Sequence, residues 1–311
     1  MWQMRSLLKG KIMREISLRS MDRRSFVKTS LGTLGAVFAL GVTESLGAEA
    51  GDQKAVRFAL LSDTHIPADV QNNNRGFYPY RNLEKVVPDV VSSSPDAVLI
   101  TGDLARLTGQ PGDYANLKKL LEPLVEKTPV FMGLGNHDNR ENFLKTFAPP
   151  AGQKPPVSGK HAAVINKGPV RLIVLDSLLY TDKTPGLLGK AQRQWLETHL
   201  KESDNTPTIL CFHHSMGDAD GDLLDVLRLF DMIKPMQKVK AIVYGHSHVY
   251  GFSQFEGIHL INLPAVGYNF NDQDPIGWVE ARLTSLGGDF NLHAAGGNKD
   301  ADGRSTKLTW R

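Results

Sequence analysis

The chain has 311 residues, 41% of them hydrophobic, and a formal net charge of +3. This length and composition allow a sizeable buried core. The single cysteine, Cys211, excludes an internal disulfide, so the fold must be held by its core or by a bound metal. Residues 1–48 hold eight of the 36 basic and three of the 33 acidic residues, which leaves 28 basic against 30 acidic for the remainder. Without that segment, no basic field remains for binding nucleic acid or anionic lipid.

The segment that begins at Met21 has the pattern of an export signal. Arg23 and Arg24 precede an apolar run at residues 31–42, and small residues follow that run. Twelve apolar residues are too few to span a bilayer, but they suit the apolar region of a signal peptide. The arginine pair resembles the twin-arginine export signal. The alternative is a buried helix, which the glycines and the cationic prefix suit poorly.

We therefore expect residues 1–48 to be an upstream extension followed by a twin-arginine-type signal peptide, with the true start at Met21. The exported protein would be periplasmic or extracellular and would have no stable membrane anchor. Residues 49–311 show no repeat, no low-complexity segment and no linker that would divide them. We expect them to form a single domain.

Apolar runs alternate with helical patterns through most of this region. Strands are predicted at residues 55–62, 96–100, 129–134, 163–166, 170–176, 207–214 and 239–248. Helices are predicted at residues 117–124 with Asp113 as the N-cap, at 189–200, and from about 222 to 233, before Pro235. From about Val249 onward the pattern predicts shorter strands without helices. The alternation indicates an α/β fold with buried sheets.

Five of these strands end in side chains that can bind metals. The ends carry Asp63 and His65; Asp103; Asn136, His137 and Asp138; His213 and His214; and His246 and His248. Each motif alone is more often a turn than a site. Ligands of α/β sheets nevertheless bind at the carboxyl ends of the strands, and five such ends in one chain favour a shared metal site.

The ligand types narrow the metal. No cysteine is among them, which argues against a structural zinc site. Imidazole with carboxylate and amide oxygen suits Mn, Fe, Co, Ni or Zn. Seven candidate ligands exceed the number that one catalytic metal needs, and they fit two metals if one carboxylate bridges.

The motifs Asp-x-His, Gly-Asp, Gly-Asn-His-Asp, a His-containing strand end and Gly-His-x-His resemble, in this order and spacing, those of the calcineurin-like metallophosphoesterases. The resemblance covers nearly all of residues 55–250. It implies a sandwich of two mixed β-sheets flanked by helices. The segments NRENFLKTF and QRQWLETHL further resemble smaller bacterial phosphodiesterases of the cyclic-nucleotide and glycerophosphodiester types.

The resemblance also implies roles for single residues. One metal would be bound by Asp63, His65, Asp103 and His248, and the other by Asp103, Asn136, His213 and His246. His213 is preferred to His214 because the ligand in the family is the first His of the pair. The cofactors would be two divalent transition metal ions such as Mn, Fe, Zn or Co. A bridging hydroxide would attack phosphorus in line, and His137 would protonate the leaving alkoxide or stabilise the charge.

One position departs from the family pattern. Many relatives carry a second Asp three residues after the Gly-Asp motif, which orients the catalytic His, whereas this chain has Arg106 there. Arginine cannot accept a hydrogen bond, so either another carboxylate orients His137 or that side chain is held less strictly. Arg106 could contact the substrate phosphate or simply be solvated, and we expect it to be solvated.

The expected activity is metal-dependent hydrolysis of a small-molecule phosphodiester. A phosphomonoesterase of the same fold is the alternative. A nuclease is disfavoured by the charge balance of residues 49–311, and a non-catalytic scaffold by the presence of all seven ligands. Two loops could set the choice of substrate: residues 67–82 could overhang the site, and residues 264–274 could close its other side.

Overall fold

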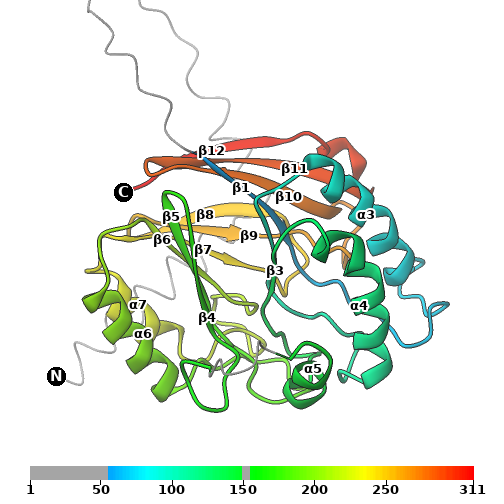
Figure 1. The fold of residues 1–311 in the computed structure, drawn as a ribbon, viewed down its shortest axis with the longest axis horizontal. Helices are drawn as coiled ribbons and strands as arrows, with labels where there is room; N and C mark the ends of the chain where they lie inside the picture. Colours follow the sequence, from blue (N-terminus) through cyan, green and yellow to red (C-terminus); the bar gives the residue numbers. More distant parts are fainter. Residues whose placement is uncertain (1–54, 149–154) are drawn as a thin grey trace, which may run out of the picture.

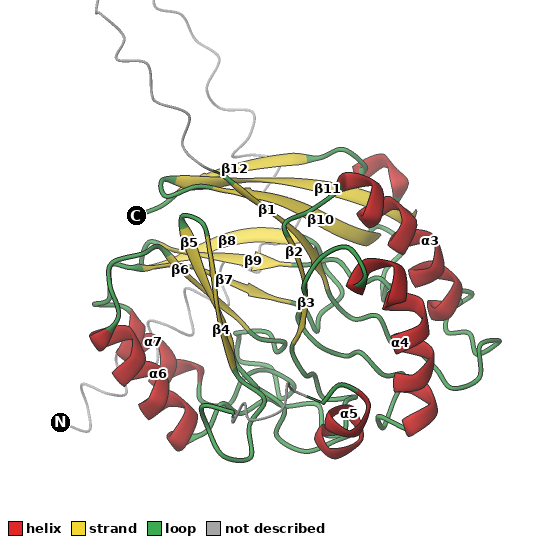
Figure 2. Ribbon diagram, in the orientation of Figure 1, coloured by secondary structure: helices red, strands yellow, loops and turns green. Residues whose placement is uncertain are grey.

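The computed structural model describes residues 55–148 and 155–311, so the expected export signal lies outside the described residues. Two mixed β-sheets of six strands each lie face to face, and helices cover their outer surfaces (Figures 1 and 2). This architecture confirms the α/β sandwich expected from the sequence. The helices of the described residues are α3 (Pro79–Ser93), α4 (Pro111–Val125), α5 (Arg140–Thr146), α6 (Lys190–Glu202), α7 (Val226–Ile233) and a short 3-10 helix, η1 (Lys299–Ala301). The strands are β1 (Val56–Leu61), β2 (Ala97–Ile100), β3 (Val130–Met132), β4 (Ala163–Lys167), β5 (Val170–Val174), β6 (Thr208–Cys211), β7 (Val239–Tyr244), β8 (Gly251–Phe255), β9 (Ile258–Asn262), β10 (Pro275–Leu283), β11 (Gly287–Gly297) and β12 (Ser305–Thr309).

The strand order places the motif-bearing strands next to one another. The first sheet has the order β12-β11-β10-β1-β2-β3, in which β1, β2 and β3 are parallel. The second sheet has the order β4-β5-β6-β7-β9-β8, in which β5, β6, β7 and β9 are parallel. Because the carboxyl ends of parallel neighbours meet at the same edge of a sheet, the loops after β1, β2 and β3 gather at one end of their sheet, as do those after β6 and β7.

Apolar side chains on both faces of each sheet form three cores. Phe58 and Leu60 of β1 point into the core between the two sheets, and the alternate residues Ala59 and Leu61 point toward α3 and α4. The outer face of the second sheet packs against α6 and α7. This two-sided burial explains why the motif-bearing strands have nearly continuous apolar sequences. No helix in the described part of the chain is long and apolar enough to cross a membrane.

Helix α4 begins earlier than the sequence predicts. Its first residue is Pro111 and its N-cap is Gln110, so the expectation that Asp113 is the N-cap is wrong. Asp113 is the third helical residue, and its carboxylate accepts a hydrogen bond from the backbone N–H of Gln110 at 2.9 Å. This is a capping box, in which the acidic residue lies inside the helix. Pro111 takes the first helical position, where its missing N–H costs no hydrogen bond.

Two further expectations differ from the structure. Helix α7 starts at Val226 rather than near residue 222, because the preceding segment forms turns in which the Asp222 carboxylate accepts from the backbone N–H of Ala219 at 2.9 Å. The region after Val249 includes β10 and β11, with 9 and 11 residues, and the 3-10 helix η1. The expectation of only shorter strands there is therefore wrong. These two strands pair antiparallel with each other, and β10 also pairs with β1, which completes the first sheet.

Candidate metal centre

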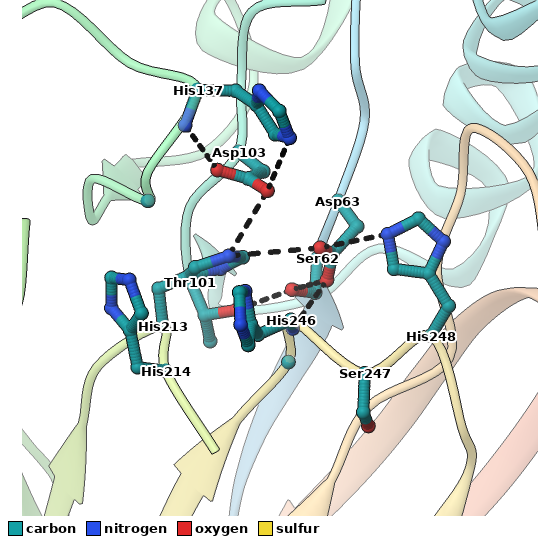
Figure 3. A network of polar contacts seen from close by, with 12 residues as sticks. Ser62, Asp63, Thr101, Asp103, His137, His213, His214, His246, Ser247 and His248 are labelled. Atoms are coloured by element: carbon teal, nitrogen blue, oxygen red, sulfur yellow. Dashed lines mark hydrogen bonds and ion pairs between the residues drawn. The ribbon is translucent and has the colours of Figure 1, made fainter. Parts of the chain in front are cut away.

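The loops after β1, β2, β3, β6 and β7 bring the candidate metal-binding side chains together. Figure 3 shows this network around two buried carboxylates. The structure places the ligand atoms of one group within 4.8 Å of one another: Asp63, His65 and His248. A second group meets the same distance: Asp103, His213 and His246. These two groups follow the division into two sites that the family resemblance implies.

Five of the seven predicted ligands have a left-handed backbone conformation, which non-glycine residues seldom adopt. They have φ between 48° and 71°, and they are Asp63, His65, Asp103, His246 and His248. Each such residue costs roughly 1–2 kcal/mol, and non-glycine residues of this kind concentrate at functional sites. Hydrogen bonds between loops hold this conformation. The backbone N–H of His65 donates to the carbonyl of Asp103 at 2.9 Å, and that of Asp63 to the carbonyl of Gly102 at 3.0 Å.

Two glycines allow the loops to approach each other. A Cβ on Gly135 would contact the Asp103 carboxylate, and a Cβ on Gly245 would contact both Ser62 and the Asp63 carboxylate. The carboxylates of Asp103 and Asp63 cannot move away to make room for such a Cβ, because each lies inside the candidate centre. The glycines of the Gly-Asn-His-Asp and Gly-His-x-His motifs are thus required by the close approach of the loops.

Asp103 lies between the two groups. Its Oδ2 atom is 3.2 Å from Nε2 of His213 and 3.8 Å from Nε2 of His65. Asp63 is closest to His248, with 3.2 Å between Oδ1 and Nε2. Asp103 therefore reaches an imidazole of each group, as a bridging carboxylate must. Asp63 does so too, because its Oδ1 lies 3.8 Å from Nε2 of both His65 and His213.

The buried carboxylates of Asp63 and Asp103 require nearby positive charge to balance their negative charge. Burial alone would raise the pKa of Asp63, but His213 and His248 hold that pKa well below its ordinary value. Burial likewise opposes ionisation of Asp103, and His213 again keeps the pKa low. Burial works to lower the pKa of His213 as well, yet the neighbouring Asp103 and Asp63 raise it to about 9. A proton on His213 therefore balances charge at a position where a bound cation would do the same.

Two other imidazoles of the site are held in the neutral form, as metal ligands must be. Burial lowers the pKa of His65 to about 3, and burial together with the neighbouring His213 lowers that of His246 to about 4. Nδ1 of His248 lies 2.6 Å from the carbonyl oxygen of Tyr268. That carbonyl can only accept, so Nδ1 carries a proton and Nε2 is the nitrogen that faces Asp63.

Unpaired buried atoms test whether the residues suit a metal. Oδ1 of Asp63, Oδ1 of Asn136 and Nε2 of His213 are buried and have no hydrogen-bond partner among the described residues. Nε2 of His65 and Nε2 of His248 face each other at 3.1 Å. Buried polar atoms are normally satisfied, so the unpaired oxygens of Asp63 and Asn136 inside this cluster of imidazoles fit a bound cation. The donor set of imidazole, carboxylate and amide oxygen fits a divalent transition metal.

His137 is held by a backbone carbonyl. Its Nδ1 lies 2.9 Å from the carbonyl oxygen of Leu107, and its backbone N–H donates to Oδ1 of Asp103 at 2.9 Å. The oriented side chain leaves Nε2 3.9 Å from Oδ2 of Asp103. Among the described residues, the hydrogen-bond partner of the ring is therefore a backbone carbonyl, and not the second carboxylate that was one of the two alternatives considered from the sequence. His137 also lies within 4.8 Å of His65 and Asp103, so distance alone does not separate it from the ligands.

Arg106 is not simply solvated, which corrects the expectation. Its Nε donates to Oδ1 of Asn72 at 3.0 Å, and its guanidinium carbon lies 5.5 Å from the centre of the Tyr268 ring. The side chain is half-buried. Arg106 thus connects the Gly-Asp loop to both of the segments expected to influence substrate choice.

Those two segments meet on the same side of the site. The side-chain amide of Asn82 donates to the carbonyl of Gly267 at 2.7 Å, and Arg75 forms an ion pair with Asp272 at 3.6 Å. The Tyr268 ring lies 4.7 Å from the His65 ring. The expectation that residues 264–274 close the opposite side is wrong, because both loops flank the turn that carries Asp63 and His65.

Asp138 has a role that the sequence interpretation missed. It is fully buried, and its carboxylate accepts from the backbone N–H groups of Gly135 at 2.8 Å, Leu104 at 3.2 Å and Ala105 at 3.1 Å, and from the hydroxyl of Tyr114 at 3.1 Å. Burial and the nearby Asp103 raise its pKa to about 7. Asp138 ties the Gly-Asn-His-Asp loop to the Gly-Asp loop. The sequence did contain a signal for this role. Asp138 follows Gly135 by three residues, and at this spacing a side-chain carboxylate can accept from the backbone N–H that begins the turn.

Comparisons with known proteins agree with this geometry. The family model of calcineurin-like phosphoesterases matches residues 56–250. A probable cyclic nucleotide phosphodiesterase of Synechococcus sp. is 30% identical, over 75% of this chain and 90% of that protein. A glycerophosphodiester phosphodiesterase of Enterobacter lignolyticus is 28% identical, over 67% of this chain and 76% of that protein.

Among solved structures, a dimetal phosphatase from Danio rerio shares the fold. Its TM-score is 0.65 at 16% sequence identity, and the match covers 82% of this chain and 99% of that chain. The matching family consists of metal-dependent phosphoester hydrolases, the class of enzyme that the sequence predicts. The family model spans more than half of this chain, and the chain therefore belongs to the calcineurin-like phosphoesterase family.

Proposed function

We propose that this protein hydrolyses small-molecule phosphodiesters with two metal ions held by the seven side chains at the strand ends. The observation that carries the proposal is the pair of ligand groups on either side of Asp103. Asp63, His65, Asp103 and His248 would hold one ion, and Asp103, Asn136, His213 and His246 the other. When bound, two such ions supply activation of a water nucleophile and neutralise charge on the phosphoryl oxygens.

The choice of a diester is supported by the relatives described above, which are named as phosphodiesterases of the cyclic-nucleotide and glycerophosphodiester kinds. The site also holds a group that can protonate a leaving alkoxide, which alkyl diesters and alkyl monoesters both expel. This group is His137, which is fixed beside the Asp103 carboxylate.

His137 would deliver its proton from Nε2. Nδ1 donates to the carbonyl of Leu107, so that nitrogen keeps its hydrogen throughout. Nε2 then carries a proton only in the imidazolium form, and this is the proton that can leave. In the neutral ring the same atom can take a proton back. The Leu107 carbonyl thus sets which nitrogen faces the reacting group.

Two neighbouring residues provide the test, because they have different roles. Asn136→Ala removes a ligand, so metal content should fall below two per chain and added metal should partly restore activity. His137→Ala removes no ligand in this scheme, so metal content should stay at two. Its rate should fall by roughly 10²–10⁴, the usual contribution of a general acid.

Substrates with different leaving groups make the test sharper. The loss in His137→Ala should shrink for nitrophenyl esters, because nitrophenolate leaves without protonation. The general-acid role of His137 is refuted if this variant loses a metal ion, or if it slows the hydrolysis of substrates with good and poor leaving groups equally. A panel of phosphomonoesters, cyclic nucleotides and glycerophosphodiesters, assayed with the metal-loaded wild type, tests the diester assignment directly. A clear preference for monoesters would overturn it.

A further inference from the structure

Phe270 is a large apolar side chain that stays exposed beside the candidate metal centre. It is 55% exposed, and its ring stacks on that of His248 with 4.3 Å between ring centres and 24° between planes. Its neighbour Tyr268 is buried and meets it edge to face at 5.6 Å. Burying a phenylalanine side chain is worth about 1.5–3 kcal/mol, so the fold leaves this stabilisation unused at Phe270.

The loop around Phe270 is fixed in place. Before it, the backbone N–H of Gly267 donates to the carbonyl of Asp63 at 2.9 Å, and His248 donates to the carbonyl of Tyr268. Across it, the side-chain amide of Asn269, the residue before Phe270, donates to the carbonyl of Asp274, four residues after Phe270, at 2.7 Å. These bonds anchor the loop on both sides of the ring. An aromatic side chain has only two rotatable bonds, so ordering it for binding costs little.

We infer that Phe270 is a specificity-determining residue, and that a planar aromatic group in the organic part of the substrate stacks on it. One face of the ring lies against His248, and the side chain remains more than half exposed to receive a partner. This inference rests on the proposed function and narrows it. A phosphodiester that carries a heteroaromatic base fits the site, whereas a glycerol diester has no flat group to place there. The contact lies on the His248 side of the centre, beside the loops that Asn82 and Gly267 join.

The matched pair of probes is adenosine 5′-monophosphate and ribose 5-phosphate, which differ only by the base. Binding of each to the metal-loaded protein is measured by calorimetry. Stacking of a base on an aromatic side chain corresponds to roughly 5- to 140-fold in affinity. The wild type should therefore prefer the adenosine compound by about tenfold or more. Phe270→Leu should remove most of this preference, and Phe270→Trp should retain it.

Tyr180→Leu is the matched control. Tyr180 is also an exposed aromatic residue, at 69%, but it lies on the loop whose Asp182 N–H donates to the carbonyl of Asn136. This variant should keep the preference for the base. If Phe270→Leu weakens both probes equally, Phe270 only supports His248, and the inference is overturned. It is also overturned if the wild type binds both probes equally or if Tyr180→Leu alone abolishes the preference.

The design keeps this inference separate from the proposed function. Binding is measured without turnover, so a protein that hydrolyses no diester can still show or lack the stacking preference. Turnover of adenosine 3′,5′-cyclic phosphate and of its base-free ribose analogue is then compared. In an active enzyme, Phe270→Leu should lower kcat/KM for the first substrate by about tenfold while changing the second little. Equal losses on both substrates would contradict the assignment.

Discussion

Asp138→Asn tests whether this buried carboxylate holds the two central loops together. Oδ2 accepts from the backbone N–H groups of Gly135 and Leu104, and Oδ1 accepts from that of Ala105 and from the Tyr114 hydroxyl. All four partners are donors, so an amide cannot replace both carboxylate oxygens. In its best orientation, the new carbonyl faces Gly135 and Leu104, and the new amino group faces the other two.

The magnitude follows from counting the donors left unpaired. The Tyr114 hydroxyl can rotate and accept from the new amino group, but the N–H of Ala105 cannot turn away. One buried donor without a partner costs about 1–3 kcal/mol. For a protein of this size, the melting temperature should fall by about 2–4 °C for each kcal/mol. Asp138→Ala should cost more, because it leaves all the donors unpaired.

The assay is urea unfolding at pH 8. Burial and the nearby Asp103 raise the pKa of Asp138 to about 7, so ionisation costs the wild type stability at this pH, and both variants escape that cost. The hydrogen bonds are therefore read from the difference between Asp138→Asn and Asp138→Ala. Asp231→Asn, an exposed substitution on α7, is the control and should change stability little. If Asp138→Ala is no less stable than Asp138→Asn, the side chain does not join the loops as described.

Three further predictions concern other positions. Arg106→Asp introduces the carboxylate that the family resemblance leads one to expect at this position. The Leu107 carbonyl already accepts from the His137 ring, so kcat should not rise, and a gain of about tenfold would contradict the assigned geometry. Gly245→Ala drives a Cβ into a buried carboxylate and should lower metal content, whereas Gly251→Ala, where a Cβ meets open space, should leave metal content unchanged; equal metal in both variants would refute the packing argument. Replacing Arg23 and Arg24 by lysine should retain the precursor in the cytoplasm in cell fractionation, and normal export would refute the twin-arginine interpretation.

The gathering of the candidate ligand side chains could be predicted because each follows a strand with an apolar sequence. Burial on both sides leaves β1 with Phe58, Ala59, Leu60 and Leu61 in succession, and the first polar residues after it mark the strand end. Parallel neighbours then carry their loops to a common edge. A local pattern of strand followed by ligand was therefore sufficient to gather side chains that are far apart in the sequence.

The orientation of His137 could not be predicted, because its partner is the backbone carbonyl of Leu107. Every residue has a backbone carbonyl, so no residue type in the sequence indicates which carbonyl accepts this hydrogen bond. The side chain at position 106 drew attention to a missing carboxylate, but the hydrogen bond is made by the next residue. A prediction that starts from residue types can identify side-chain partners but not backbone partners.

The contact between residues 67–82 and residues 264–274 also lacked a local signal. Asn82 and Gly267 are 185 residues apart in sequence, and their contact depends on the pairing of β10 with β1. That pairing brings the end of the chain back beside the first strand. The position of Phe270 against His248 follows from the same return, so it could be recognised only in the folded structure.

Metal stoichiometry tests the central claim most directly. Elemental analysis of purified, active protein should find two transition metal ions per chain. Removal of both by a chelator should abolish hydrolysis, and adding the metal back should restore it. Fully active protein that contains one metal ion or none would contradict the proposal of a two-metal centre shared through Asp103.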